Sequence, residues 1–185
     1  ILDYFNNKIV KKIKTKFGQP DVITATNVFA HIENPKKLLK DILKLLDKDG
    51  IFVTESHYLI PLIEELQYDT IYHEHLRYYS LSSLKYLFSL FNLRIIDAKK
   101  ILTHGGSIRV TATKNKKLKQ SKEVVKILRH EKKYLNIKRF QKFKDDIVLS
   151  KLNLNKLLFK IKKKKKLIFG IGAPSRASTL INYVG

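Results

Sequence analysis

Cysteine is absent from all 185 residues, so the chain has no disulfide framework and no thiolate metal site. This fits a reducing compartment, and we expect a cytoplasmic protein. Methionine is also absent, and the chain opens on Ile1-Leu2-Asp3-Tyr4 with no signal-peptide pattern. Because a natural chain begins with methionine, we expect this one to be a segment of a longer protein.

Long apolar runs are missing as well. No stretch of about 18 uncharged apolar residues occurs, so we expect no membrane-spanning helix and no membrane partner. Acidic residues are few: 16 Asp and Glu stand against 38 Lys and Arg, a net charge of +22. Such an excess can attract nucleic acid, which makes a basic RNA-binding or RNA-modifying protein one hypothesis. Most of the excess is lysine, however, in runs such as 162–166 that are typical of solvated surfaces.

Strand and helix patterns alternate in the first part of the chain. Residues 21–25 and 51–55 are short, β-branched stretches typical of buried strands. Between them, helical spacing covers 36–46, with Asn34 as the expected N-cap and Pro35 in the first turn. A strand, helix and strand joined by short loops predict a parallel βαβ unit.

An antiparallel hairpin is expected after this unit. Residues 93–102 and 108–113 read as strands, and His104-Gly105-Gly106-Ser107 between them is a turn sequence. Further helices are expected over 3–16, over 59–67 and from Ser80 to Phe91. The first part should therefore be a three-layered α/β domain that ends in a hairpin.

The character changes near residue 115, and we divide the chain into residues 1–115 and residues 116–185. Residues 121–161 are lysine-rich with helical apolar spacing, which predicts one long amphipathic helix or a pair of them. Residues 166–178 then predict a strand, a glycine turn and a helix. Gly170-x-Gly172 would let the backbone approach a phosphate, which Arg176 could pair with. A tight turn without a ligand fits equally well, because Ser175 replaces the third glycine of a dinucleotide fingerprint.

Acid–base side chains are densest at Tyr72-His73-Glu74-His75. Each can move a proton or hold a charge, and histidine does so near neutral pH. A helical turn would place Tyr72 and His75 on one face. An extended backbone would instead pair His73 with His75, which could ligate a metal. A polar turn without any function remains the third interpretation.

Four stretches, taken together and in this order, resemble one enzyme family. They are Asn27-Val28-Phe29-Ala30-His31 after a strand, Tyr72-His73-Glu74-His75 with Tyr78-Tyr79-Ser80, His104-Gly105-Gly106-Ser107-Ile108-Arg109, and the residues from Gly172 to Tyr183. The family is that of the S-adenosylmethionine-dependent sugar C-methyltransferases, which methylate C3 of a nucleotide-linked 4-keto-deoxysugar. The Tyr-His-Glu-His block is the most specific of the four.

The resemblance implies a fold and a set of partners. It implies the back half of a class I, Rossmann-like methyltransferase domain with a terminal antiparallel hairpin, then a helical linker and the start of a second Rossmann-like domain. Family members also carry a zinc-binding N-terminal part and a glycine-rich cofactor loop, neither of which is seen here. The implied cofactor is S-adenosylmethionine, and the implied partner is a nucleotide sugar rather than nucleic acid. Whether the segment binds the cofactor or turns over alone is left open.

The resemblance also assigns roles at the reacting centre. His75 would be the general base that removes the C3 proton, and Glu74 would orient an imidazole or hold a sugar hydroxyl. Tyr72 and His31 would donate hydrogen bonds to the developing oxyanion. On position alone, His31 lies where open α/β sheets bind ligands, although a surface histidine would look the same.

The remaining assignments concern binding. The resemblance places Asn27 and Val28 at the amino acid end of the cofactor, and Arg176 at the substrate diphosphate. His104 and Arg109 would meet a phosphate or the sugar, or would stabilise a solvated hairpin. We interpret His57 and His130 as surface residues. The sequence indicates neither the sugar, the nucleotide nor the oligomeric state.

Overall fold

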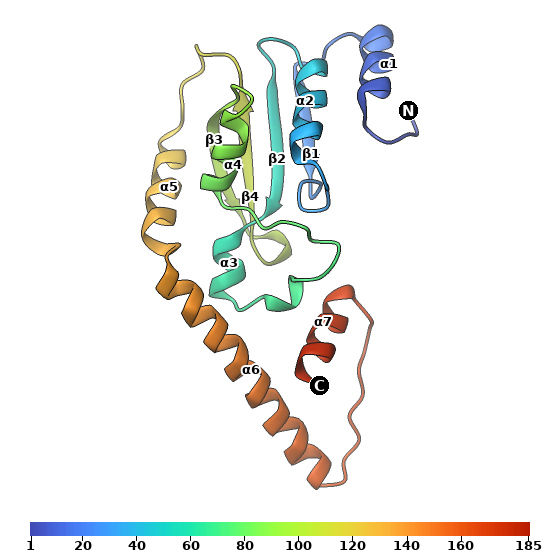
Figure 1. Cartoon of the computed structure of the whole chain (residues 1–185), viewed down its shortest axis with the longest axis vertical. Coiled ribbons are helices and arrows are strands. Elements are labelled where there is room, and N and C mark those ends of the chain that lie inside the picture. Colours follow the sequence, from blue (N-terminus) through green and yellow to red (C-terminus); the bar gives the residue numbers. More distant parts are fainter.

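A four-stranded mixed sheet occupies the first part of the computed structural model, which describes residues 1–185 (Figure 1). Strands β1 and β2 are parallel, and β4 runs antiparallel to both β2 and β3. This confirms the parallel βαβ unit and the antiparallel hairpin predicted from the sequence. The strands lie in the order β1 (Val22–Thr26), β2 (Ile51–His57), β4 (Ser107–Thr113) and β3 (Arg94–Ile101).

The helices begin at the residues that sequence chemistry favours. The Asn34 side chain accepts a hydrogen bond from the Lys37 amide, and Pro35 takes the first helical position, as expected. Ser80 and Ser83 form a reciprocal capping box at the next long helix of the sheet domain. The α-helices are α1 (Asn7–Phe17), α2 (Pro35–Leu45), α3 (Leu59–Glu64), α4 (Leu81–Ser89), α5 (Lys122–Tyr134), α6 (Ile137–Lys163) and α7 (Ser175–Val184), and the 3-10 turns are η1 (Tyr68–Thr70) and η2 (Thr103–Gly105).

The core lies on one face of the sheet. Phe52 of β2 and Val110 of β4 are fully buried there, and Phe88 of α4 packs against Phe52 with ring centroids 5.9 Å apart. On the other face Val22 is 49% exposed and the Arg109 side chain is 51% exposed. The expected three-layered arrangement is therefore wrong for this chain. This part of the chain has two layers, a sheet and a layer of helices, because α2 and α4 both pack on the same face of the sheet.

A buried carboxylate joins α5 to this core. Glu131 is 1% exposed and accepts hydrogen bonds from Tyr58 Oη at 3.0 Å, from the Leu81 amide at 2.6 Å, and from the amide and hydroxyl of Ser82 at 2.8 and 2.5 Å. The two amides are free N–H groups of the first turn of α4, where a negative charge is favourable. Burial, together with this carboxylate, raises the pKa of Tyr58 well above its usual value of 10, so Tyr58 keeps the proton that it donates.

Of the two alternatives left open for residues 121–161, one long helix or a pair, the structure shows a pair, and the second helix runs away from the sheet (Figure 1). The chain then turns back, and α7 lies between α6 and η1. Lys151 and Asn155 of α6 donate to the carbonyls of Tyr183 and Val184 at 2.7 and 3.2 Å, which caps the end of α7. The Tyr183 ring lies 5.4 Å from the ring of Tyr68. None of the helices could serve as a membrane span.

The strand expected near residues 166–170 is not formed. Residues 166–174 have no regular structure, and Phe169 and Ile171 are 80% and 99% exposed. A strand needs a neighbour for its backbone hydrogen bonds, and no other strand of this chain lies beside this segment. Of the three elements expected here, only the helix is present, as α7, and Gly172, at φ +82°, lies in the irregular segment before it instead of in a turn. The division at residue 115 stays a prediction, although α5 beyond it belongs to the core of the sheet domain.

Candidate active site

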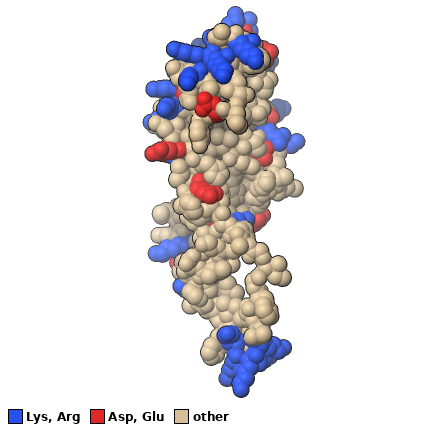
Figure 2. All heavy atoms as spheres, turned by 90° about the vertical axis from the view of Figure 1, so that its right-hand side faces the viewer, with Lys and Arg blue, Asp and Glu red and all other residues tan.

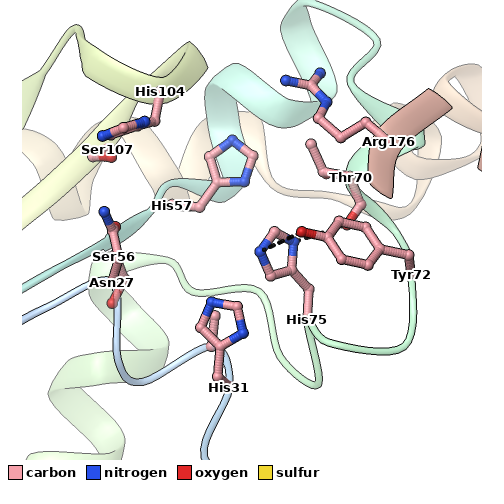
Figure 3. Close-up of a pocket in the computed structure, with 11 residues that line it drawn as sticks. Asn27, His31, Ser56, His57, Thr70, Tyr72, His75, His104, Ser107 and Arg176 are labelled. Atoms are coloured by element: carbon pink, nitrogen blue, oxygen red, sulfur yellow. Dashed lines mark hydrogen bonds between the residues drawn. The ribbon is translucent and has the colours of Figure 1, made fainter. Parts of the chain in front are cut away.

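A pocket of about 310 Å³ opens at the carboxyl ends of β1 and β2, next to the turn between β3 and β4 (Figure 3). This is the edge at which open α/β sheets bind ligands. Six of the residues singled out in the sequence line it together: Asn27, His31, Tyr72, His75, His104 and Arg176. The other lining residues are Ala30, Ser56, His57, Thr70 and Ser107.

A tight turn brings Tyr72 and His75 to the same side. The His75 amide donates to the Tyr72 carbonyl at 3.0 Å, and the two rings lie 4.5 Å apart. This is the spacing of one helical turn, which is one of the alternatives left open by the sequence. The residues between them face outward: the side chains of His73 and Glu74 are 87% and 53% exposed, and they lie 4.0 Å apart. Because His73 and His75 do not share a face, the extended alternative is wrong, and Glu74 does not line the pocket.

One backbone carbonyl decides where the His75 ring carries its proton. His75 Nδ1 lies 2.9 Å from the Thr70 carbonyl oxygen, which can only accept a hydrogen bond. The neutral ring is therefore protonated at Nδ1, and its lone pair is at Nε2. Tyr72 Oη lies 3.4 Å from Nε2 and donates to it. Tyr78 also donates to the Thr70 carbonyl, at 3.0 Å, and burial raises its pKa above the usual value, so it remains a donor.

Contacts between two loops bring His31 to this group. The Leu76 amide donates to the Ala30 carbonyl at 2.9 Å. Arg77 donates to the carbonyls of residues 32 and 33 at 2.5 and 2.8 Å, which fastens the Tyr72–Tyr79 loop to the loop after β1. As a result, the His31 and His75 rings lie 5.0 Å apart. Histidine, tyrosine and histidine thus meet from two loops that are distant in the sequence.

Two predicted binding residues lie outside the pocket. Arg109 of β4 donates to Glu55 of β2 through Nε at 2.9 Å and pairs with it through Nη2 at 2.8 Å. The pair therefore joins β4 to its neighbour β2 and does not join the two strands of the hairpin. Val28 is half-buried and is not part of the lining, whereas Asn27 beside it, at φ +55°, lines the pocket.

Arg176 reaches the pocket from α7. Its Nε and Nη2 donate to the Asp69 carboxylate at 3.0 and 2.8 Å, across 107 positions of the sequence. No protein acceptor lies at its Nη1, so one end of the guanidinium remains open to a ligand. This residue is the only contribution of the last third of the chain to the lining.

His57 is the main lining residue that the sequence analysis missed. It is half-buried in the pocket, so its interpretation as a surface residue is wrong. Burial lowers the pKa of His57 below its usual 6.5, and nearby His75, Arg176 and His104 lower it further against the effect of a hydrogen bond to Gln67. Its position directly after the buried strand 51–55, at the ligand-binding edge, was the available signal.

Positive charge does not form one continuous track on the face drawn in Figure 2. Lys and Arg gather there mainly at the two ends of the molecule, and the lower group belongs to the end of α6 and the turn after it. Between the two ends, uncharged surface predominates. This face therefore shows no continuous basic groove of the kind that follows a nucleic-acid backbone.

Two protein-family models match this chain. Residues 3–98 match the methyltransferase domain family, and residues 102–185 match the C-methyltransferase C-terminal domain. The chain is 30% identical over 184 residues to C-methyltransferase NovU of Streptomyces niveus, which covers 98% of this chain and 44% of the relative. The chain thus spans less than half the length of this curated relative.

Two solved structures are similar in part. One is a SAM-dependent methyltransferase from Anabaena variabilis, with 15% identity and a TM-score of 0.44 over 60% of this chain and 56% of that one. The other is the magnesium protoporphyrin IX methyltransferase of Synechocystis with bound SAH, with 11% identity and a TM-score of 0.42 over 52% of this chain and 46% of that one. From the matches of its two parts, this chain belongs to the S-adenosylmethionine-dependent C-methyltransferase family.

Proposed function

We propose that the protein transfers a methyl group from S-adenosylmethionine to C3 of a nucleotide-linked 4-keto-deoxysugar, through an enolate. Family membership supports transfer to carbon. The observation that carries the proposal is the His75 Nε2 lone pair, oriented by the Thr70 carbonyl and placed in a pocket beside the Tyr72 hydroxyl.

Carbon needs electron density before it can accept a methyl group. A ketone at C4 makes the neighbouring C3–H bond acidic. When a base takes this proton, the C–H electrons move into the C3–C4 bond and onto the ketone oxygen, which becomes an enolate oxyanion. The site must therefore hold a base at C3 and a hydrogen-bond donor at the oxygen.

The pocket residues can divide this work. In the proposal, His75 Nε2 takes the C3 proton, and the ring becomes an imidazolium that still donates from Nδ1 to Thr70. The Tyr72 hydroxyl hydrogen can rotate away from Nε2, because a hydroxyl turns to suit its acceptor, and donate to the oxyanion. His31, whose ring lies 5.0 Å from that of His75, is the second donor to this oxygen. Glu74 and Arg109 have no part in the proposal, because neither lines the pocket.

The cofactor would be held in part by residues at the end of the first two strands. Ser56 Oγ lines the pocket, is buried and has no hydrogen-bond partner, so an unused donor and acceptor await a polar ligand. Asn27 adds an exposed amide at the end of β1. These residues fit the charged amino acid end of S-adenosylmethionine, which supplies an electrophilic methyl group on a sulfonium sulfur when bound.

Proton exchange without methyl transfer tests the enolate directly. The full-length protein is incubated in D₂O with a 4-keto-deoxysugar nucleotide, with S-adenosylhomocysteine in place of the methyl donor. We expect deuterium to enter C3, since His75 can return a solvent deuteron to the enolate, and NMR of the recovered sugar locates it. A His73→Ala protein should exchange equally well, because His73 faces solvent. Deuterium at another carbon would contradict the proposal. So would a protein that transfers the methyl group but exchanges no proton at C3.

Arg176 offers a separate test of the nucleotide part of the substrate. If its open Nη1 meets the diphosphate, Arg176→Gln should raise KM about tenfold or more with little change in kcat, because a charged hydrogen bond contributes about 1.5–3 kcal/mol. Asp69→Asn is the matched control: it weakens the contact to α7 but keeps the cation, so its KM should change less. Equal effects of the two changes would show that only the contact with α7 matters.

A further inference from the structure

His57 has a hydrogen-bonding arrangement that the proposed reaction does not use. Its Nε2 lies 3.1 Å from Oε1 of Gln67, a buried residue at the end of the loop after α3. The amide nitrogen of Gln67 donates twice, to the Gly105 carbonyl at 2.7 Å and to the Glu65 carboxylate at 2.7 Å. Both amide hydrogens of Gln67 are therefore donated to oxygens that carry no hydrogen of their own.

These contacts determine the orientation of the Gln67 amide. If the amide were reversed, its oxygen would face a carbonyl and a carboxylate, and both hydrogen bonds would be lost. Gln67 Oε1 must therefore face His57, and it can only accept. The neutral His57 ring then carries its proton at Nε2, and its lone pair is at Nδ1. His57 and His75 thus have opposite tautomers.

The turn between β3 and β4 is shaped to fit this arrangement. Gly105 has φ +77°, and a Cβ there would lie 2.5 Å from Gln67 Oε1 and 2.9 Å from its nitrogen. A Cβ on Gly106, at φ +101°, would lie 2.6 Å from Pro61 of α3. Only glycine lets the turn approach α3 so closely. The Gln67 amide is held by this close contact on one side and by His57 on the other.

The free nitrogen of His57 is left for the pocket. Figure 3 shows the His57 ring across the pocket from the His75 ring, with one nitrogen facing Tyr72 and His75. Nε2 is engaged with Gln67, so Nδ1 is the nitrogen that is available there. We propose that His57 Nδ1 accepts a hydrogen bond from a hydroxyl or amino group of the substrate and so selects for sugars that carry such a donor near the reacting carbon.

The substrate class in this inference rests on the proposed function, whereas the tautomer of His57 rests only on its contact with Gln67. The titratable and charged groups that act on the His57 ring are His75 on the Tyr72–Tyr79 loop, Arg176 on α7 and His104 at η2, and the Glu65 carboxylate accepts from the Gln67 amide. Because burial, His75, Arg176 and His104 lower the pKa of His57, the ring is neutral at pH 7 and its Nδ1 can accept. As the pH falls through that pKa, below 6.5, Nδ1 gains a proton and acceptance is lost.

Two substitutions separate the two nitrogens. An asparagine amide reaches about as far as Nδ1, and a glutamine amide about as far as Nε2. In the full-length enzyme, we expect His57→Asn to keep KM within about threefold and His57→Gln to raise KM about tenfold or more, with kcat changed less in both. The acidic limb of kcat/KM that belongs to His57 should disappear in both variants. If both leave KM and that limb as in the wild type, the proposal is wrong.

Substrate analogues provide the decisive measurement. For a set of 4-keto-sugar nucleotides that each lack one hydroxyl or amino group, one analogue should raise KM for the wild type but not for His57→Gln. Strictly additive effects across the whole set would overturn the assignment. The assignment would also be overturned if the ¹⁵N NMR spectrum of the wild-type protein at pH 7 showed that the His57 proton is on Nδ1. If C3 proton exchange still depends on His75 while the effects at His57 are additive, the proposed function stands and this inference alone falls.

Discussion

Replacement of His75 by alanine should lower methyl transfer by about 100- to 10,000-fold, the range that a positioned general base contributes. The expectation follows from geometry: the lone pair of Nε2 lies in the pocket because Nδ1 donates to the Thr70 carbonyl at 2.9 Å. Steady-state turnover of a 4-keto-deoxysugar nucleotide by the full-length enzyme gives the measurement. The loss should appear in kcat and in kcat/KM alike, since the proton moves only in the chemical step.

The neighbouring histidine makes a close control. His73 lies two positions away and carries the same side chain, but it is 87% exposed and faces solvent, so His73→Ala should retain near wild-type turnover. His75→Gln should be as slow as alanine, because an amide cannot take a proton from carbon. Undiminished turnover of His75→Ala would remove His75 as the base, and an equal loss in His73→Ala would point to damage to the loop.

Replacement of Glu131 by alanine should lower the free energy of unfolding by about 3–5 kcal/mol. The carboxylate is 1% exposed and accepts four hydrogen bonds, from Tyr58, from the Leu81 amide and from Ser82. Each buried donor left without an acceptor costs about 1–3 kcal/mol, and their effects are not additive. Urea unfolding of the full-length protein, followed by a signal from the sheet domain, measures the loss.

Two further changes make the origin of this loss clear. Glu123→Ala, in the first turn of the same helix with a side chain 45% exposed, should change stability by less than about 0.5 kcal/mol. Tyr58→Phe removes one donor and leaves the carboxylate on the start of α4, so its cost should be near 1 kcal/mol. Should Glu131→Ala cost no more than Tyr58→Phe, the contact with α4 would contribute little.

Local patterns were sufficient to predict most of the secondary structure. Asn34 and Ser80 start helices because their side chains satisfy free amides a few residues away. The two glycines between β3 and β4 were recognised as a turn, and the β-branched runs as strands. The strand predicted for residues 166–170 was wrong for a different reason. A strand depends on a neighbouring strand, and the local sequence carries no information about whether one is present.

The site was predictable where it depends on short spacing. Tyr72 and His75 meet because they are three positions apart in a turn, and the same turn directs His73 and Glu74 outward, which residue types alone did not reveal. The rest depends on distant contacts. Gln67 meets the Gly105 carbonyl across 38 positions, and Glu131 meets the start of α4 across 50. Such pairs follow from the packing of whole elements, so the roles of His57 and Glu131 emerge only from the structure.

The short turn η1 serves two neighbours at once. Asp69 holds Arg176 of α7, and the adjacent Thr70 offers the carbonyl that orients His75. A single peptide unit therefore separates the attachment of the C-terminal helix from the group that selects the protonated nitrogen of the base. The attachment of the C-terminal helix and the orientation of the base are thus both fixed by adjacent residues of one 3-10 turn.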